Sequence, residues 1–165
     1  MASAVTALRH AAEMLRYAAT RSDHDRRDAE TASELTVSSD ALDLPPGLEL
    51  TWLGVAGFAL SYENTTILFD PYVTRVGTRE MWSRRALTAD REQIDRWVPR
   101  ADAILLGHTH FDHALDVPAV AARDRCPVYG GASSAHLLGL WDLAEHARVV
   151  EPHRPFEVGP FTITF

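Results

Sequence analysis

The chain has 165 residues, 46% of them hydrophobic, and its 16 basic and 23 acidic side chains give a formal net charge of −7. A chain of this length fits one domain, its apolar content excludes wholesale disorder, and it has no run of about 18 apolar residues that could span a bilayer. The single cysteine, Cys126, excludes an internal disulfide, and the acidic balance argues against a nucleic-acid partner.

The first 46 residues differ in character from the rest. Before residue 20, apolar residues recur at steps of three and four, which predicts one face of a helix. The polar stretch Ser22–Asp43 and the Pro-Pro-Gly that follows it predict a flexible linker. We therefore expect a helical appendage and linker over residues 1–46 and a domain over residues 47–165. The start lacks a secretory pattern and the chain has one cysteine, so we expect a cytoplasmic protein.

Short strands and helices are expected after residue 47. The expected strands are 48–54, 58–62, 66–69, 101–106, 127–130, 148–150 and 161–165, and the expected helices are 88–98, 114–123 and 133–140. A turn at Glu63-Asn64-Thr65 predicts a hairpin. We expect a layered α/β (α+β) fold, with the early strands in one sheet and helices on its outer face. The residues expected to be largely buried are Trp52, Leu60, Leu68, Ile104 and Leu106.

One cluster of side chains indicates chemistry. His108, His110, Asp112 and His113 stand within six positions, directly after the expected buried strand 101–106. Neutral imidazole and carboxylate are ligands that Zn²⁺, Fe and Mn accept. Without a cation, four such groups on one loop would repel one another or lack partners. The alternative is that the histidines only cap a strand–helix junction.

The spacing within this cluster favours two neighbouring metals over one. His108 and His110 are two apart on a chain leaving a strand, so both can point to one side. Asp112 and His113 are adjacent, so they diverge unless the loop turns into a helix between them. We expect residues 107–113 to form a loop, with a helix beginning near Ala114 and the four side chains converging on one pocket.

The pattern His-x-His-x-Asp-His after a strand resembles the signature of the metallo-β-lactamase fold. Residues 52–58 and 67–72 look like the opening strands of that fold's broad hydrolase branch. That branch includes ascorbate-phosphate lactonase-like proteins and the N-acyl-phosphatidylethanolamine phospholipase D group. The resemblance implies the N-terminal half of an αββα sandwich, here preceded by the helical appendage.

Roles for individual residues follow from this resemblance. It implies that His108 and His110 bind one metal and that Asp112 and His113 bind the other. Asp70 matches the acidic residue that ends an early strand and supports the site, and Asp116 is also similar to the branch. Such supporting carboxylates orient a metal-binding imidazole and fix its tautomer. For Asp70 alone, a turn-initiating role before a proline is the alternative.

The implied activity is hydrolysis of ester, lactone or phosphodiester bonds by a metal-activated hydroxide. Zn²⁺ is the expected cofactor, with two ions in the complete domain, and Mn²⁺ or Fe are alternatives. Asp112 is the expected catalytic residue, because one carboxylate oxygen could remain free to accept a proton. Cys126 is expected to be a small, inert buried residue.

A basic segment follows Asp70 and suggests the substrate. Four arginines and a tryptophan, with Glu80 as the opposing acid, lie in this segment: Arg75, Arg79, Arg84, Arg85 and Trp82. They would suit a small anionic substrate, for example a phosphorylated one. The alternative is a solvated basic loop. Membrane association is not indicated, and the sequence does not define an oligomeric state.

The chain stops inside the expected strand 161–165, whereas the family places a further histidine, an aspartate and a last histidine beyond such a strand. We therefore expect a domain that is truncated at its C-terminus. Two other functions remain open. One is a catalytically incomplete fragment with a partial metal site. The other is an iron-dependent, persulfide-type oxidising enzyme of the same fold.

Truncation carries a structural expectation. The inner face of the first sheet should lack a full partner, so some of its apolar side chains should be exposed. The candidates are Phe58, Leu60, Ile67, Phe69, Phe161, Ile163 and Phe165. We also expect marginal stability, weak metal binding and little hydrolase activity from these 165 residues alone.

Overall fold

The computed structural model describes residues 44–83 and 85–165, together with Ala12, Arg16, Thr20 and Arg26. Residues 45–165 form one compact unit. In the preceding unit, the backbone N–H and hydroxyl of Thr20 donate to the Arg16 carbonyl at 3.1 and 3.0 Å, as in a helical turn. The expected linker lies almost wholly outside the described residues, so the division at residue 46 stays a prediction. Within the described ranges, none of the helices has the length and hydrophobicity that crossing a bilayer requires.

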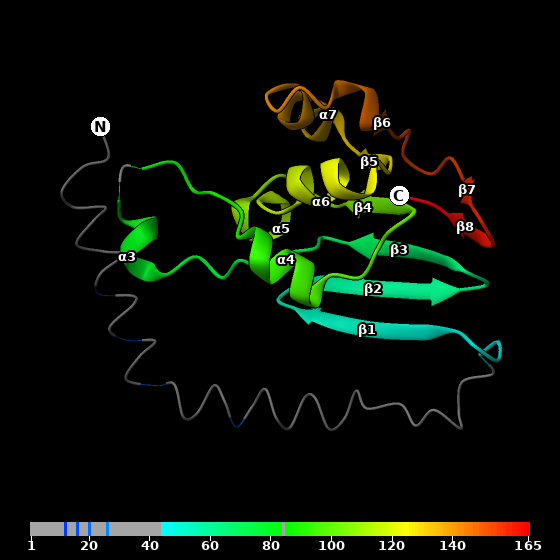
Figure 1. The fold of residues 1–165 in the computed structure, drawn as a ribbon, viewed down its shortest axis with the longest axis horizontal. Helices are drawn as coiled ribbons and strands as arrows, with labels where there is room; N and C mark the ends of the chain where they lie inside the picture. The colour runs from blue at the N-terminus through cyan, green and yellow to red at the C-terminus, as the bar shows by residue number, and fades with distance from the viewer. Residues whose placement is uncertain (1–11, 13–15, 17–19, 21–25, 27–43, 84) are drawn as a thin grey trace. The chain divides into compact units, whose positions relative to one another are not determined.

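A six-stranded mixed sheet forms the centre of the compact unit (Figure 1). In spatial order its strands are β1 Glu49–Gly54, β2 Gly57–Tyr62, β3 Thr65–Phe69, β4 Ala103–Leu106, β5 Val128–Gly130 and β6 Ala147–Val149. The first three strands are antiparallel, and β3 to β6 are parallel. Glu63 and Asn64 join β2 to β3 with φ angles of 46° and 62°, which are typical of the two-residue hairpin turn that the sequence predicts.

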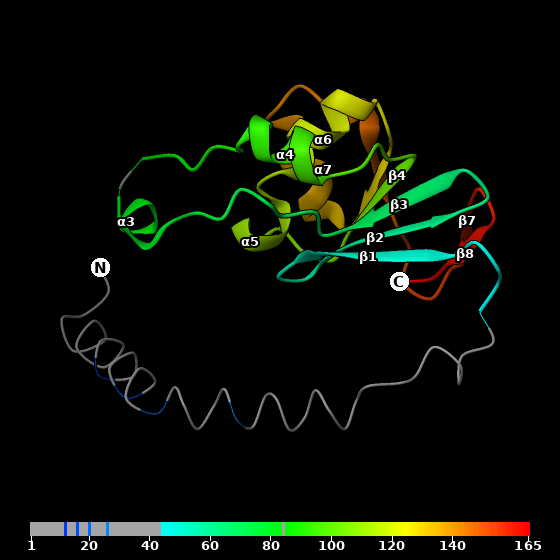
Figure 2. The ribbon, with the colours of Figure 1, turned by 60° about the horizontal axis from the view of Figure 1, so that its bottom comes forward.

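Helices cover one face of this sheet (Figure 2). The helical segments are α3 Thr78–Met81, α4 Arg91–Trp97, α5 Phe111–Ala114, α6 Val117–Asp124, α7 Ala132–Gly139 and the 3-10 turn η2 Ala144–His146. Ile94 of α4, Val120 of α6 and Leu138 of α7 join the same buried cluster as Leu68 and Ile104 of the sheet. Each such side chain contributes about 1.5–3 kcal/mol when fully buried. This face therefore holds the main core.

A two-stranded antiparallel sheet, β7 Phe156–Val158 with β8 Phe161–Ile163, packs on the other face. It covers Ile67, Ala103 and Leu105, which alternate along their strands with the residues of the main core. The Tyr129 ring of β5 stacks on Phe156 with ring centroids 4.5 Å apart. The order of helices, sheet and second sheet agrees with the expected layered α/β class.

The expected exposure of the inner face is wrong in its particulars. Ile67 is fully buried, and the other six candidate side chains are partly buried, four of them packed in the cluster with β7 and β8. Two residues of edge strand β1 are exposed instead, Leu50 at 65% and Trp52 at 67%. They pair with Leu60 and Phe58, so they lie on the inner face but beyond the segment that the small sheet packs against. The expected burial of Trp52 is therefore also wrong.

The ends of two helices differ from expectation. The helix expected from residue 88 begins at Arg91, because the Asp90 carboxylate accepts the Gln93 N–H at 3.1 Å and caps it. The helix expected from residue 114 is split into α5 and α6. Pro118 stands in the first turn of α6, where its missing N–H costs no hydrogen bond. The loop expected over residues 107–113 is correspondingly shorter, because α5 begins at Phe111.

Candidate metal centre

The histidine-rich loop begins at the carboxyl end of β4. Leu106 is the last residue of that strand and pairs with Gly130 of β5. His110 is the N-cap of α5, and its carbonyl accepts the backbone N–H groups of His113 and Ala114 at 3.0 and 2.9 Å. The chain therefore turns into a helix between His110 and His113. This is the condition under which the last two polar residues of the motif can face the first two.

The imidazoles of the motif lie against one another. The ring centroids of His108 and His110 are 4.7 Å apart, and those of His108 and His113 are 3.9 Å apart. The nearer carboxylate oxygen of Asp112 is 3.9 Å from Nε2 of His113. His108 and His110 are exposed, whereas Asp112 and His113 are partly buried. The fold thus brings together the four side chains that the sequence singles out.

Asp70 fixes one of these rings. It follows β3 with a left-handed φ of 42°, and its two carboxylate oxygens bind two parts of the motif. Oδ1 accepts the Gly107 N–H at 2.8 Å, and Oδ2 lies 2.8 Å from Nδ1 of His113. Because an ionised carboxylate only accepts, Nδ1 is the nitrogen that donates to Asp70, and in the neutral imidazole Nε2 then carries the lone pair. Asp70 therefore orients His113 so that Nε2 is free to bind a ligand.

Asp116 supports a different part of the structure. Its buried carboxylate accepts the backbone N–H groups of Val73 and Thr74 at 2.7 and 2.9 Å, and it also accepts the Thr74 hydroxyl. Asp116 thus holds the segment that follows Asp70, rather than an imidazole. Sequence reasoning missed Thr74, since nothing in its local pattern marks a residue whose partner lies 42 positions away.

The five residues proposed from sequence to bind substrate have different surroundings. Arg75 donates to the carbonyls of Tyr72 and Leu53 at 2.6 and 2.9 Å, so its guanidinium is engaged in holding backbone. Arg79, Trp82 and Arg85 are exposed, and no hydrogen bond or ion pair joins them to the histidines in the described part of the chain. The fifth, Arg84, lies outside the described residues.

The imidazole and carboxylate donors of the motif fit a divalent transition metal. Among the residues that the structure describes, no three His, Cys, Asp or Glu side chains already surround a common point. The His108 ring neighbours both other imidazoles, 4.7 Å from that of His110 and 3.9 Å from that of His113, and Asp112 lies 3.9 Å from Nε2 of His113. For one ion to be bound by the exposed rings of His108 and His110, their side-chain torsions would have to bring two nitrogens to ~2.1 Å from it.

A small cavity of about 190 Å³ lies beside the motif on the inner face of the sheet. Asp70 and Gly107 line one part of it, and Ile163, Thr164 and Phe165 line the rest. The end of the described chain therefore lies next to the carboxylate that holds His113.

Cys126 and His146 are neighbours, and no hydrogen bond joins either of them to the histidine motif in the described part of the chain. Burial raises the pKa of the Cys126 thiol to about 12, and the nearby Asp124 charge adds to this effect. A thiol with this pKa stays protonated at neutral pH and does not act as a nucleophile, as the sequence predicts. Nδ1 of His146 lies 3.0 Å from the Cys126 carbonyl oxygen.

The comparison with protein families decides the wider relationship. Residues 65–165 match the family model described as the β-lactamase superfamily domain. The chain belongs to that superfamily. The matched residues include Asp70, the whole histidine motif and Asp116, and the metallo-β-lactamase fold predicted from the sequence is confirmed.

Related proteins are named metal-dependent hydrolases. A UPF0173 metal-dependent hydrolase of Ruegeria pomeroyi is 33% identical over 103 residues, which cover 62% of this chain and 39% of the relative. Another from Myxococcus xanthus is 33% identical over 93 residues, covering 56% of this chain and 29% of the relative. The chain therefore spans about two fifths or less of the length of these relatives.

Among solved structures, a metallo hydrolase from Ignicoccus hospitalis is 18% identical, with a TM-score of 0.49. The match covers 68% of this chain and 43% of that one.

Proposed function

We propose that the protein is a metal-dependent hydrolase whose metal is held by the histidine motif. The observation that supports this most is the pair of contacts on His113. Its ring lies 3.9 Å from that of His108, and its Nδ1 is held by Asp70, so Nε2 is presented toward the other donors. An imidazole oriented in this way by a carboxylate is the usual arrangement behind a metal ligand.

The ligands divide into two pairs. His108 and His110 would hold one cation, and Asp112 and His113 would hold a second, with Zn²⁺ as the proposed metal and Mn²⁺ or Fe as alternatives. When bound, such a cation lowers the pKa of its water toward ~7 and polarises a carbonyl or phosphoryl oxygen.

The protein's own groups have distinct tasks in this proposal. Asp70 keeps His113 in one tautomer and one orientation through its hydrogen bond to Nδ1. Asp112 is partly exposed, so one of its oxygens can accept a proton from the reaction. No serine or cysteine nucleophile is required, and the protonated thiol of Cys126 agrees with this. The proposed substrates are small molecules with an ester, lactone or phosphodiester bond.

Metal binding to the 165-residue chain tests the proposal. Zinc bound per chain would be measured by elemental analysis after dialysis, and affinity by competition with a chromophoric chelator. We expect the H108A/H110A variant to lose zinc, while H136A, which removes an exposed histidine of α7, keeps it. Equal zinc binding by wild type, H108A/H110A and H136A would contradict the proposed ligands.

Activity is tested separately. The zinc-loaded chain would be assayed with 4-nitrophenyl acetate, a γ-lactone and bis(4-nitrophenyl) phosphate, with D112N as the matched variant. Because we expect little activity from these 165 residues alone, even slow hydrolysis supports the proposal if it depends on zinc and falls in D112N. Hydrolysis that D112N leaves unchanged would remove Asp112 from the proposed role.

A further inference from the structure

The segment 75–89 leaves the fold and returns to it at a single point. The hydroxyl of Thr74 donates to Asp116 and accepts the Asp90 N–H, the latter at 2.8 Å. Asp90 in turn caps α4. The two ends of the segment are therefore joined by one side chain, while α3 between them stands apart from the sheet (Figure 1). Loops with adjoining ends that project from a rigid scaffold are frequent carriers of specificity.

This loop is rooted at the candidate metal centre. Asp116, which accepts three hydrogen bonds from Val73 and Thr74, stands three positions after His113. Asp70, which binds His113, stands four positions before Thr74. Both sides of the loop root are thus tied to the elements that carry the histidines.

The loop encloses a cavity of its own, about 650 Å³ in volume. This is within the range of sites that take small molecules, ~300–1,000 Å³. Its lining includes two basic residues, Arg79 and Arg85, one acidic residue, Glu80, and the apolar residues Trp82 and Leu87. Trp82 is 79% exposed, which is unusual for a large aromatic side chain that has only to be packed.

The charges of the loop are unbalanced. It has four arginines and a single acid, Glu80, in a chain of net charge −7. Glu80 is engaged within the loop, since its carboxylate accepts the Gly77 N–H at 3.1 Å. Arg75 is engaged with backbone carbonyls, but neither Arg79 nor Arg85 forms a side-chain hydrogen bond or ion pair with any residue that the structure describes.

We propose that this loop cavity binds an organic anion, with Arg79 and Arg85 on its phosphate or carboxylate and Trp82 against its apolar part. Its role in presenting a substrate to the histidine motif rests on the proposed hydrolase function. Guanidinium groups bind phosphate through paired, charge-assisted hydrogen bonds, and an exposed indole offers a flat apolar surface. The proposal separates Arg79 and Arg85, which bind the anion, from Arg75, which holds the loop.

Phenyl phosphate is a suitable probe, because it combines the two features that the cavity would recognise. Its binding to the full chain would be measured by calorimetry at low salt, with the protein metal-free and then zinc-loaded. We expect R79A/R85A to raise the Kd for phenyl phosphate in the metal-free protein about tenfold, the scale of one charge-assisted hydrogen bond. We expect W82A to weaken phenyl phosphate but not inorganic phosphate.

The matched control is R91A, which removes an exposed arginine of α4 outside the cavity. It should change the Kd less than twofold. An R79A/R85A protein that binds phenyl phosphate as wild type does would show a solvated basic loop and overturn the proposal. Loss of binding to phosphatidylserine vesicles with unchanged phenyl phosphate affinity would overturn it too, because the loop would then be a membrane contact.

The two proposals can fail separately. Binding of phenyl phosphate only after zinc loading, and independent of the two arginines, would place the anion at the metal centre. That result would overturn the loop site and leave the hydrolase proposal standing. Arginine-dependent binding in a chain that takes up no zinc would support the loop site and overturn the hydrolase proposal.

Discussion

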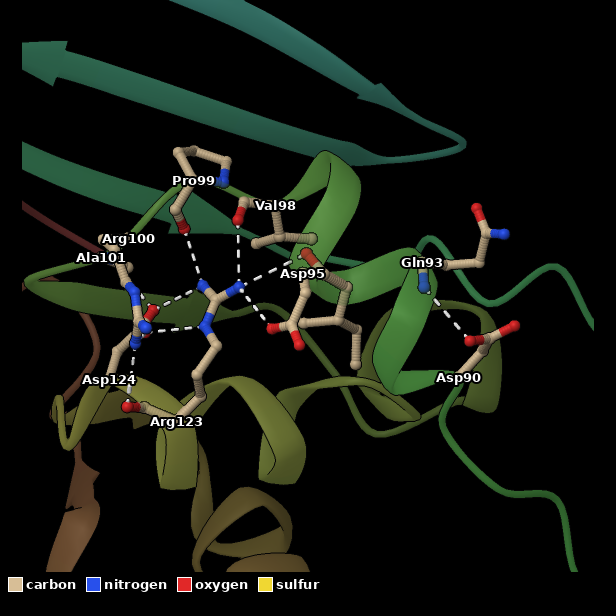
Figure 3. A network of polar contacts seen from close by, with 10 residues as sticks. Asp90, Gln93, Asp95, Val98, Pro99, Arg100, Ala101, Arg123 and Asp124 are labelled. Carbon is tan, nitrogen blue, oxygen red and sulfur yellow. Dashed lines mark hydrogen bonds and ion pairs between the residues drawn. The ribbon is translucent and has the colours of Figure 1, made fainter.

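Two carboxylates, Asp124 and Asp70, each join segments that are distant in the sequence, but their partners differ. The Asp124 side chain is 2% exposed and binds the guanidinium groups of Arg123 and Arg100, each with a contact of 2.7 Å, together with the Ala101 N–H (Figure 3). Asp70 binds one backbone N–H and a single nitrogen of His113. Asp124 pairs with guanidinium groups, which are always positively charged. Asp70 contacts only one ring nitrogen of His113, so the other nitrogen stays available.

The Arg123 side chain shows what complete pairing achieves. Besides Asp124, it donates to the carbonyls of Ile94, Val98 and Pro99 at 3.3, 3.1 and 2.8 Å (Figure 3). The Val98 and Pro99 carbonyls follow the end of α4, where no further helical N–H reaches them, and the Ile94 carbonyl also accepts the Val98 N–H at 2.9 Å. Arg123 therefore links α4 to α6, and its guanidinium group is fully engaged in these contacts. Pairing that is incomplete, as at His113, is what leaves a nitrogen available for chemistry.

The largest effect is expected from R123A. This substitution leaves Asp124 buried with less positive charge and removes the donor of the Val98 and Pro99 carbonyls, so we expect a loss of about 3 kcal/mol in the free energy of unfolding. Urea denaturation followed by circular dichroism measures it. Zinc affinity of the folded protein should be unchanged. If R123A were as stable as wild type but bound zinc more weakly, the separate roles of Asp124 in stability and Asp70 in metal binding would be contradicted.

D70N should show the opposite pattern. The variant keeps the size of the side chain but weakens the hold on Nδ1 of His113, so we expect zinc affinity to fall about 10–100-fold. Chelator competition measures the change, and D124N serves as the matched variant with an amide at the other carboxylate. Equal zinc affinities in D70N, D124N and wild type would show that Asp70 is structural only.

The pH dependence of stability should report Asp124. Burial raises the pKa of Asp124, but hydrogen bonds from Arg123 and Arg100 outweigh this, so the pKa is lowered below its ordinary value of 3.8. The folded state then favours the ionised form. Its contribution is complete above the unfolded-state pKa and is lost as the pH falls through the lower folded-state pKa. We expect the stability difference between wild type and D124N to be constant from pH 7 to about 5 and to shrink below about 4. A difference that grows on acidification would contradict this sign.

The smallest effect is expected from R154A. Arg154 and Glu151 form an ion pair at 2.9 Å, but their side chains are 72% and 70% exposed. Exposed pairs of this kind contribute little, so the free energy of unfolding should change by less than about 0.5 kcal/mol. A loss close to that of R123A, in the same urea titration, would mean that burial does not explain the difference between the Arg154–Glu151 pair and the Arg123–Asp124 pair.

The sequence allowed the parts of the fold that local patterns encode to be predicted. The apolar run that ends at Leu106 predicted a buried strand, and β4 is buried throughout. The turn at Glu63 and Asn64 predicted the hairpin of β2 and β3. By contrast, β7 was not predicted, because Phe156-Glu157-Val158 is too short to show a clear alternation.

What the sequence could not supply depends on contacts between distant segments. The four polar residues of the motif were found by their spacing alone. The contact of Asp70 with His113, 43 positions away, was expected only through the family resemblance. Neither source indicated that Thr74 joins Asp116 to Asp90, or that Arg75 is engaged with backbone carbonyls. Trp52 has the alternation of a core residue, yet it is exposed because its strand lies at the edge of the sheet.

The joining of residues 74 and 90 has a consequence for how this protein can vary. Because the excursion between them starts and ends at the same place, its length is decoupled from the geometry of the sheet and of the histidine motif. Closing a flexible loop twice as long costs only about 0.6 kcal/mol more. We therefore expect insertions, deletions or grafts between residues 76 and 89 to leave the sheet and the histidine motif in place, which would let the proposed anion site change independently of the proposed metal centre.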